Sequence, residues 1–424
     1  MDLTKKMTKL AHDAHEASFS MASLAGGKKT KILKGMAKAL LKNKSSILKA
    51  NDKDIKNGRS KGLSSALLDR LALNDKRIEL MGSSIIDVAK LKDPVGVVLK
   101  HWRRPNGLKI AKVSVPLGVI LVIYEARPNV TAECVSLSIK SGNSIILKGG
   151  SEAYNSNRAI VSVFKDVLRK MKIPQAAVSF VTSTERKSVD ELLVLNQYIN
   201  VVIPRGGEGL IRKIVEKSKI PVIKHYKGIC HVYVDEYADE AVAERIVVNA
   251  KLQRPGVCNA CETLLVHEKI ARSFLASCLK SLQDKGCEIR GCDKTRAIVD
   301  SCWNLRPIHK ATEQDFATEY LDAILSVRIV RSLEEAVAHI KKYGSAHTDA
   351  IVTKKKKKAD MFVKYVDSSS VMVNASTRFS DGNQYGLGAE IGISTDKLHA
   401  RGPMGLEGLT SYKYVVVGNG QIRV

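Results

Sequence analysis

The feature that most constrains this chain is a succession of short apolar runs, rich in Val and Ile, that begins near residue 113. Helix-like amphipathic stretches, such as Ser151–Met171 and Gly209–Lys219, separate these runs. Because the runs are continuous rather than alternating, they are typical of strands covered on both faces. The order of elements therefore predicts βαβ units and a mostly parallel sheet with helices on both sides. The predicted strands are Gly118–Tyr124, Ser144–Leu147, Ala177–Val181, Asn200–Pro204 and His231–Val234.

The regions on either side of this succession follow other patterns. The first ninety residues read as helices, and the βαβ pattern recurs after residue 258, which predicts a second α/β unit. Residues 97–115 predict a hairpin around Asn106-Gly107, and the segment SYKYVVVG near the C-terminus predicts a strand with nothing following to cover it. Unpaired edges of this kind favour association, so we expect a homo-oligomer. One buried helical face is predicted from Ile32, Leu33, Met36, Ala37, Leu40 and Leu41.

Composition excludes several classes of protein. With 44% hydrophobic and 26% charged residues, the chain is not disordered. It has no apolar run near the ~18–20 residues needed to cross a bilayer, and its polar N-terminus lacks a signal peptide. Eight cysteines are too few for a disulfide scaffold. We therefore expect a cytoplasmic globular protein.

The net charge, 69 − 43 = +26, suits a nucleic-acid binder or an enzyme that acts on acidic substrates. The densest cluster, Lys354–Lys358, follows the strand-like run Asp349–Thr353 and has no interleaved aromatic residues. Because stacking platforms for nucleic acids usually contain aromatic residues, we interpret the cluster as a solvated loop or helix start. Nucleic-acid binding is not expected.

Two predicted strands run directly into glycine-rich turns that open helices. The first turn carries Lys148, and the second carries Arg205, Gly206 and Gly207. Glycines allow close backbone approach, and the N–H groups at a helix N-terminus favour an anionic phosphate. Neither turn matches G-x-G-x-x-G or the P-loop, so each alone is also compatible with a plain turn. Together they favour a nucleotide or another phosphorylated ligand.

The segment NAKLQRPGVCNACETLLVHE places Cys258 in a turn before the predicted strand Thr263–Val266. Such a thiol is either a nucleophile or a small buried residue. The C-x-x-C spacing with Cys261 also raises a redox pair or a zinc site, although the spacing of the second pair, Cys287 and Cys292, is poor for zinc. His225 and His231 have nothing nearby in sequence to complete a metal set. We interpret both as ordinary polar or packing residues and expect no metal.

A glycine-rich stretch of nearly thirty residues begins at Asp381, and long ordered loops of this kind usually carry function. The segment before it offers Asn374, Ser376, Thr377 and Arg378, which are suited to holding a carboxylate or a phosphate.

These motifs in combination resemble the gamma-glutamyl phosphate reductase family, a branch of the aldehyde dehydrogenase superfamily. The resemblance runs over essentially the whole chain. It implies an α/β fold with a Rossmann-type cofactor domain (1–94 and 116–228), a catalytic α/β domain (229–395) and a small β oligomerisation element (95–115 and 396–424). It is carried by YEARPNVT, SIILKGG, VVIPRGG, QRPGVCNACETLLVH, VNASTRFSDGNQYGLGAEIGIST and KLHARGPMGLEGL.

The resemblance implies the NADPH-dependent reduction of L-glutamate 5-phosphate to L-glutamate 5-semialdehyde and phosphate, the second step of proline biosynthesis from glutamate. Cys258 is then the nucleophile that forms a thioester. Because the chain opens directly on the reductase helices, we expect a separate glutamate 5-kinase to supply the substrate.

Further roles carry over by position. The resemblance assigns Asn129 to the oxyanion, Lys148 to the cofactor ribose, and Gly206 and Gly207 to the pyrophosphate. Glu319 matches the glutamate that holds the nicotinamide ribose. Polarity and position select the substrate-binding candidates, which are Arg127, Ser376, Thr377 and Arg378.

One departure from the superfamily is informative. Hydrolytic members carry a glutamate base in an E-L-G-G motif about thirty residues before the nucleophile, whereas this chain has HYKGICH there. The absence favours reduction of an acyl phosphate over oxidation of an aldehyde. The alternatives are a related dehydrogenase that oxidises another small aldehyde, and a basic nucleic-acid-binding or zinc-structured protein.

Overall fold

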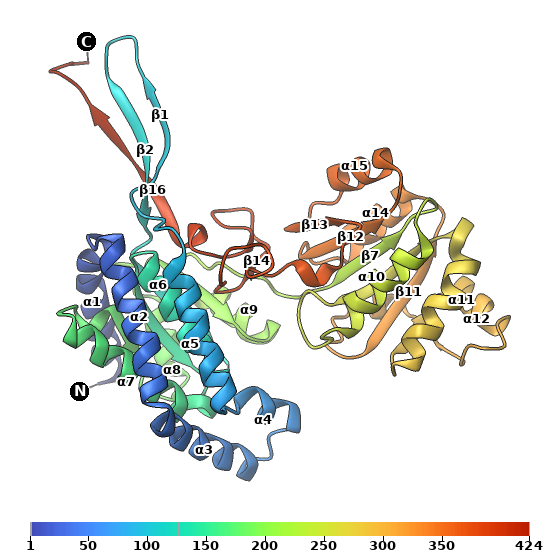
Figure 1. Ribbon diagram of the computed structural model, residues 1–424, viewed down its shortest axis with the longest axis horizontal. Coiled ribbons are helices and arrows are strands. Elements are labelled where there is room, and N and C mark those ends of the chain that lie inside the picture. The colour runs from blue at the N-terminus through green and yellow to red at the C-terminus, as the bar shows by residue number, and fades with distance from the viewer. Residues whose placement is uncertain (1, 126, 424) are drawn as a thin grey trace. The chain divides into compact units, whose positions relative to one another are not determined.

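The computed structural model describes residues 2–125 and 127–423 (Figure 1). It divides into two compact α/β units. Unit 1 contains the chain up to Lys224, Gly386–Gly392 and the residues from Pro403 on. Unit 2 contains His225–Tyr385 and Ile393–Gly402. Among the described residues, no helix is both long and apolar enough to cross a membrane.

Unit 1 is built on a four-stranded sheet of order β5-β4-β3-β6 in which all neighbouring strands are parallel. The apolar runs that predicted these strands are buried almost completely, as continuous runs in a doubly covered sheet should be. The prediction of a parallel sheet is confirmed. Its strands are β3 (Val119–Tyr124), β4 (Ser144–Gly149), β5 (Val178–Phe180) and β6 (Val201–Arg205).

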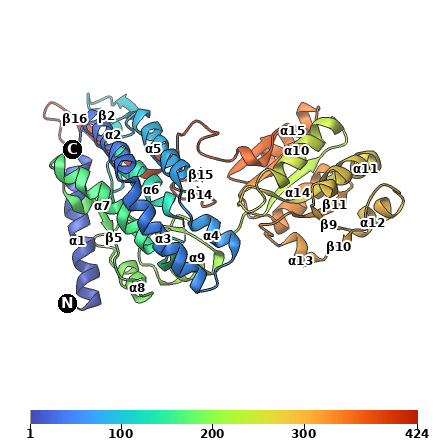
Figure 2. The ribbon, with the colours of Figure 1, turned by 60° about the horizontal axis from the view of Figure 1, so that its bottom comes forward.

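Helices cover both faces of this sheet. One face packs against α1, α8 and α9 through a core that includes Met7, Leu121, Leu192 and Ile214. On the other side, α2, α3 and α5 pack on α6 and α7, and α4 packs on α3, as Figures 1 and 2 show. The helices are α1 (Leu3–Ala22), α2 (Gly26–Lys42), α3 (Lys44–Ser60), α4 (Ser65–Leu71), α5 (Asp75–Lys90), α6 (Pro128–Lys140), α7 (Tyr154–Lys170), α8 (Lys187–Leu193) and α9 (Glu208–Lys217).

The apolar face predicted for α2 is buried with one exception. Ile32, Leu33, Met36, Ala37 and Leu40 are all inaccessible, whereas Leu41 is 44% exposed. Leu41 lies at the edge of the stripe, where its side chain approaches Gly82 of α5. Its inclusion in the buried face was therefore wrong.

A three-stranded antiparallel arm extends from unit 1 (Figure 1). The predicted hairpin forms β1 (Val98–Arg103) and β2 (Lys109–Pro116), and the predicted terminal strand forms β16 (Thr410–Val417). These two segments do not leave separate open edges as we expected, because β16 pairs with β2 along its whole length. The outer edges of β1 and β16 remain the edges of this sheet.

Unit 2 contains a seven-stranded parallel sheet of order β10-β9-β11-β8-β7-β12-β13. Its first strand, β7, contains the run His231–Val234 that we grouped with the first sheet, so the second unit starts well before residue 258. The strands are β7 (Cys230–Val234), β8 (Cys261–His267), β9 (Glu288–Gly291), β10 (His309–Lys310), β11 (Ile324–Val330), β12 (Thr348–Val352) and β13 (Ser370–Val373).

Alternate residues of β7 face two different cores in unit 2. Val232 and Val234 pack with α10, α11 and α12, whereas Tyr233 packs with α14 and α15. The helices are α10 (Glu240–Leu252), α11 (Glu268–Asp284), α12 (Asp293–Asp300), α13 (Glu313–Phe316), α14 (Leu333–Tyr343) and α15 (Lys356–Tyr365). The short strands β14 (Ile393–Ser394) and β15 (Gly402–Pro403) lie in the glycine-rich stretch near the C-terminus.

The lysine cluster is a helix start, as predicted. Lys355 is the N-cap of α15, and Lys356 pairs with Asp360 one turn later. Lys354 pairs with Asp239 at 2.9 Å. These contacts with carboxylates fit the interpretation of a solvated helix face.

Candidate active site

Cys258 lies in the turn between α10 and β8, as the sequence predicted. Cys258 is half-buried, whereas five of the eight cysteines are buried. The turn is fixed from both sides. The Cys230 thiol at the start of β7 donates to the Cys258 carbonyl at 3.2 Å. The side-chain amide of the next residue, Asn259, donates to the Ser380 carbonyl at 2.8 Å.

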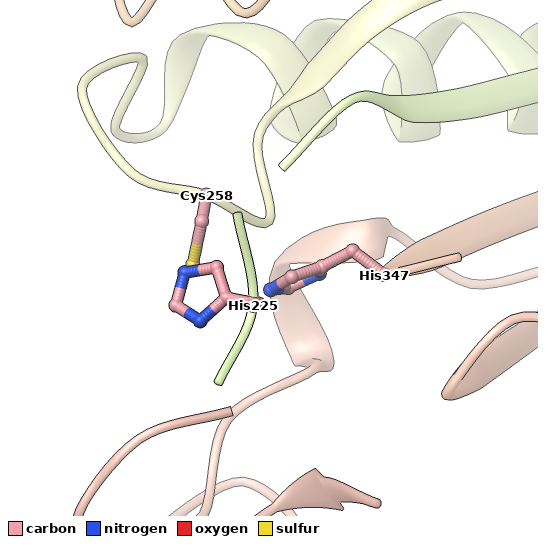
Figure 3. Close-up of side chains that lie close together, drawn as sticks. All are labelled: His225, Cys258 and His347. Atoms are coloured by element: carbon pink, nitrogen blue, oxygen red, sulfur yellow. The ribbon is translucent and has the colours of Figure 1, made fainter. Parts of the chain in front are cut away.

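Two histidines lie beside this cysteine. Ligand atoms of His225, Cys258 and His347 all lie within 4.8 Å of one another. Figure 3 shows the Sγ atom of Cys258 pointing toward the imidazole of His225, while the His347 ring approaches from a different segment. The two rings are 5.5 Å apart between centroids. Cys258 therefore sits in an imidazole-lined environment rather than in the apolar core.

The topology of the sheet explains why these three residues meet. His225 precedes β7, Cys258 precedes β8, and His347 directly precedes β12. The order β8-β7-β12 makes these strands neighbours, and all of their pairings are parallel. Residues that precede neighbouring parallel strands lie at the same edge of a sheet. From the sequence we interpreted His225 as a polar or packing residue and did not predict His347, because the order of the strands is not encoded in a local pattern.

The hydrogen bond of His225 fixes its tautomer. Nδ1 lies 2.9 Å from the Ile393 carbonyl oxygen, which can only accept a hydrogen bond. Nδ1 therefore carries the proton, and Nε2 presents a lone pair. A neutral imidazole in this form can take a proton from a neighbouring thiol.

The substrate-binding candidates Ser376, Thr377 and Arg378 lie in unit 2 after β13. Ser376 caps the short helix Thr377–Phe379 by accepting from the Arg378 backbone N–H, and both Ser376 and Thr377 are buried. Arg378 donates from Nε to the Gln253 side chain at 2.8 Å. Burial and the neighbouring Arg254 lower the pKa of Arg378, and the charge of Cys258 acts in the opposite direction. Arg378 is therefore the member of this set within electrostatic reach of the thiol.

Unit 1 holds Arg127 and Asn129 at the start of α6, where Arg127 is the N-cap. The Asn129 amide donates to Glu133 one turn later at 2.9 Å. Three of the four residues predicted to bind a cofactor, Lys148, Gly206 and Gly207, are also in this unit. Lys148 is the second-last residue of β4 and is buried, with its Nζ 3.2 Å from the Gly149 carbonyl oxygen. Burial lowers the pKa of Lys148, and Glu152 partly opposes this.

The turn at Gly206 and Gly207 connects β6 to α9. The Gly207 N–H, at the N-terminus of α9, donates to the Glu125 carboxylate at 3.1 Å. A β-carbon at position 206 would lie only 2.7 Å from that carboxylate. Arg205 points elsewhere, since its Nη1 donates to the Ile391 carbonyl at 2.5 Å. A carboxylate of the chain therefore occupies the position where an anion is favoured.

Glu319 lies between α13 and β11 in unit 2, beside a buried ion pair. Lys251 Nζ lies 2.6 Å from Glu262, and both side chains are inaccessible. Burial, with a smaller contribution from the charge of Glu319, raises the pKa of Glu262 to about 7 against the opposing effect of Lys251. Glu319 is thus electrostatically coupled to this pair.

The C-x-x-C spacing does not produce a paired site. Cys261 is buried on β8, where its thiol donates to the Thr263 carbonyl at 3.3 Å. Burial raises the pKa of Cys261 to about 12. Within residues 2–125 and 127–423, the group of side chains that could hold a metal ion includes Cys258 but not Cys261, Cys287 or Cys292. Cys261 is a core residue.

Comparisons with known proteins by sequence profile and by sequence identity agree with one another. A sequence profile described as "Aldehyde dehydrogenase family" matches residues 3–287. A gamma-glutamyl phosphate reductase from Thermodesulfovibrio yellowstonii is 51% identical over 423 residues, which are 100% of both chains. A protein of the same name from Moorella thermoacetica is 54% identical over 410 residues, or 97% of each chain.

The fold agrees equally well with a solved structure. The crystal structure of a gamma-glutamyl phosphate reductase from Thermotoga maritima superimposes with a TM-score of 0.95 at 47% sequence identity. The match covers 99% of this chain and 100% of that one.

Proposed function

The chain belongs to the gamma-glutamyl phosphate reductase branch of the aldehyde dehydrogenase family, and we propose that it reduces L-glutamate 5-phosphate to L-glutamate 5-semialdehyde with NADPH. The observation that carries this proposal is the half-buried thiol of Cys258 beside an imidazole whose Nε2 presents a lone pair. A thiolate is the nucleophile needed to displace phosphate from an acyl phosphate.

The first step uses residues of unit 2. Nε2 of His225 takes the proton from Cys258, and the thiolate attacks the acyl carbon of the substrate. The bond from that carbon to the phosphate oxygen breaks as the thioester forms. The imidazolium then gives its proton to the departing phosphate, so that charge and protons balance. General acid–base catalysis of this kind contributes roughly 10²- to 10⁴-fold.

The oxyanion formed during attack needs hydrogen-bond donors. We assign this role to the side-chain amide of Asn129 and the backbone N–H of Cys258, in keeping with the family motif. Donors of this kind are worth roughly 10²- to 10³-fold in kcat. Arg378 is the cation assigned to the anionic substrate, because its positive charge interacts with Cys258 and its side chain is held by Gln253. Ser376 and Thr377 form the turn that carries it, and Arg127 is a second candidate from unit 1.

The residues of unit 1 fit a dinucleotide. A phosphate needs close approach to backbone N–H groups at a helix N-terminus, and a side chain at position 206 would fill that space. Gly206 and Gly207 would receive the pyrophosphate, Lys148 a ribose, and Glu319 of unit 2 the nicotinamide ribose. When bound, the dinucleotide supplies the hydride that converts the Cys258 thioester to the aldehyde and releases the thiolate.

The environment of Cys258 also disfavours hydrolysis of the thioester. The glutamate base of hydrolytic relatives is absent from HYKGICH. We further propose a cytoplasmic homo-oligomer that associates through the β1-β2-β16 arm and receives its substrate from a separate glutamate 5-kinase.

The reverse reaction tests this proposal. Purified protein is mixed with pyrroline-5-carboxylate, which is in equilibrium with the semialdehyde, and with phosphate and NADP⁺, and NADPH formation is followed by absorbance. We expect phosphate-dependent formation that is lost in Cys258→Ala. The matched control is Cys292→Ala, which removes another half-buried cysteine of unit 2 and should keep activity. Formation without phosphate would indicate a hydrolytic dehydrogenase and overturn the proposal.

A further inference from the structure

The cluster of Cys258, His225 and His347 has features that the reaction does not require. A proton relay needs one imidazole beside the thiol, but two are present, and all three ligand atoms fall within 4.8 Å of one another (Figure 3). One thiolate and two imidazoles are a ligand set that Zn²⁺ favours, and three protein ligands leave a fourth position for water or another small ligand.

The second nitrogen of each ring is held as in metal-binding histidines. Such histidines usually bind the metal with one ring nitrogen and donate from the other to an oxygen acceptor. Nδ1 of His225 donates to the Ile393 carbonyl at 2.9 Å, and Nδ1 of His347 lies 2.9 Å from the Thr348 hydroxyl oxygen. The first contact leaves Nε2 of His225 as the ligand atom. The Thr348 hydroxyl, with the Cys230 sulfur 3.7 Å from the same Nδ1, holds the His347 ring in place.

The distances permit binding after a small adjustment. Zn–S bonds of about 2.3 Å and Zn–N bonds of about 2.0–2.1 Å in a tetrahedral site place ligand atoms roughly 3.3–3.7 Å apart. The three ligand atoms here lie within 4.8 Å of one another. Side-chain rotations that move each atom by about 1 Å therefore bring them to the spacing of a tetrahedral zinc site. His225 and Cys258 are half-buried, which leaves a route for the ion, whereas His347 is fully buried and held in place.

We propose that Cys258, His225 and His347 form a binding site for Zn²⁺ or a similar thiophilic divalent cation, and that binding reversibly masks the nucleophile. On binding, the Cys258 thiol loses its proton to solvent, and sulfur and both Nε2 atoms donate lone pairs to the metal. No oxidation takes place. The masking of activity rests on the proposed function, whereas metal binding itself rests only on the geometry.

Binding is measured first, without substrate. Co²⁺ is added to the reduced, metal-free protein, and the thiolate-to-cobalt charge-transfer absorption is recorded, followed by competition with Zn²⁺. We expect a charge-transfer band that Zn²⁺ removes. Cys258→Ser should abolish the band, and His225→Asn or His347→Asn should each weaken Zn²⁺ affinity at least tenfold. The matched control is His309→Asn, on the exposed strand β10, which should bind like the wild type.

Protection of the thiol gives a second readout. Iodoacetamide labelling of the Cys258 peptide is followed by mass spectrometry, with and without Zn²⁺, and after addition of EDTA. We expect protection that EDTA reverses and that is lost in His225→Asn. Circular dichroism shows whether each variant is folded, and because His225 is half-buried, its variant is informative even where His347→Asn does not fold.

The outcomes separate the two proposals. Cobalt binding without a charge-transfer band, or equal Zn²⁺ affinity in wild type and folded histidine variants, overturns the metal site. Zn²⁺ binding at Cys258 in a protein without reductase activity supports the metal site and contradicts the proposed function. Reductase activity that Zn²⁺ inhibits and EDTA restores, with inhibition weakened in the histidine variants, supports both.

Discussion

Gly228 packs directly against the backbone of Cys258: a β-carbon at position 228 would lie 2.0 Å from the Cys258 carbonyl oxygen and 2.5 Å from its Cα. No side chain fits this space, because the obstacle is backbone rather than the flexible end of a side chain. The nucleophile turn therefore depends on a glycine that precedes β7, in a different part of the chain.

Gly228→Ala should consequently displace the Cys258 turn. We expect kcat/KM to fall at least 100-fold, because a shift of about 1 Å at a reacting group can cost that much. Steady-state kinetics and the rate of Cys258 alkylation check this. The control is Gly27→Ala, at a helical glycine without a positive φ where an added β-carbon would meet nothing within 4 Å, and this variant should keep full activity. Unchanged kinetics in Gly228→Ala would show that the turn tolerates the shift.

Glu125→Gln should strengthen dinucleotide binding. The Glu125 carboxylate accepts the Gly207 N–H at the N-terminus of α9, so its charge competes with an incoming phosphate. Removing a charge at a helix N-terminus is worth roughly 0.3–1 kcal/mol, which predicts a two- to fivefold lower Kd. A fluorescence titration with NADPH measures this Kd. Glu216→Gln, further along the same helix, should leave Kd unchanged. Weaker binding in Glu125→Gln would mean that this carboxylate contacts the cofactor.

His339→Phe should remove part of the acid sensitivity of the fold. Burial, with the nearby charges of His231, Arg328 and Lys342, lowers the pKa of His339 to about 2. The folded state thus keeps this ring neutral, whereas the unfolded chain takes up a proton below pH about 6.5. The neutral His339 ring therefore costs no unfolding free energy above about pH 6.5. Below that pH, it lowers the free energy of unfolding by about 1.4 kcal/mol for each pH unit.

Urea unfolding at pH 7.5 and 5.5 tests this. The decrease in unfolding free energy between these pH values should be roughly 1.4 kcal/mol smaller in His339→Phe than in the wild type. In the wild type, the His339 ring packs against Phe316 and Tyr343. Circular dichroism at pH 7.5 checks that the variant, with a phenyl ring in this place, is folded. An identical pH dependence would show that His339 titrates alike in both states.

Lys251→Met should destabilise unit 2 strongly. It leaves the buried carboxylate of Glu262 without its cation, which typically costs about 3–5 kcal/mol. Burial already raises the pKa of Glu262 to about 7, and loss of Lys251 removes an effect that lowers it, so the cost of the substitution should grow as the pH rises above about 7. The double variant Lys251→Met/Glu262→Leu should recover most of the loss in urea unfolding. The exposed pair offers a control, since Lys9→Met should cost less than about 1 kcal/mol. A double variant no more stable than the single one would contradict this account.

The sequence predicted those parts of the fold that depend on local patterns. The runs that form β3, β4 and β6 are apolar on both faces, and the glycine turns after β4 and β6 are where the structure has them. The sheet to which β7 belongs could not be assigned in this way, because sheet membership depends on non-local pairing. The pairing of β16 with β2 was missed for the same reason.

In the candidate site, too, some residues could be predicted from local sequence patterns and others could not. Cys258 stands out because a turn with Pro and Gly precedes it, and a buried strand follows it. His347 has no signal in its own neighbourhood, since its position depends on the adjacency of β7, β8 and β12. A sequence analysis that first assigned the strand order of the second sheet would have brought His225, Cys258 and His347 to one edge.

The division of the chain into units also has a consequence for how the protein can be cut or recombined. The backbone passes from one unit to the other after Lys224, after Tyr385, after Gly392 and after Gly402. A protease that nicks the chain at the first passage leaves three further covalent links intact, so a single cleavage cannot release either unit. For the same reason, no contiguous gene fragment encodes unit 1, and exchanging unit 2 with that of a relative requires four junctions rather than one.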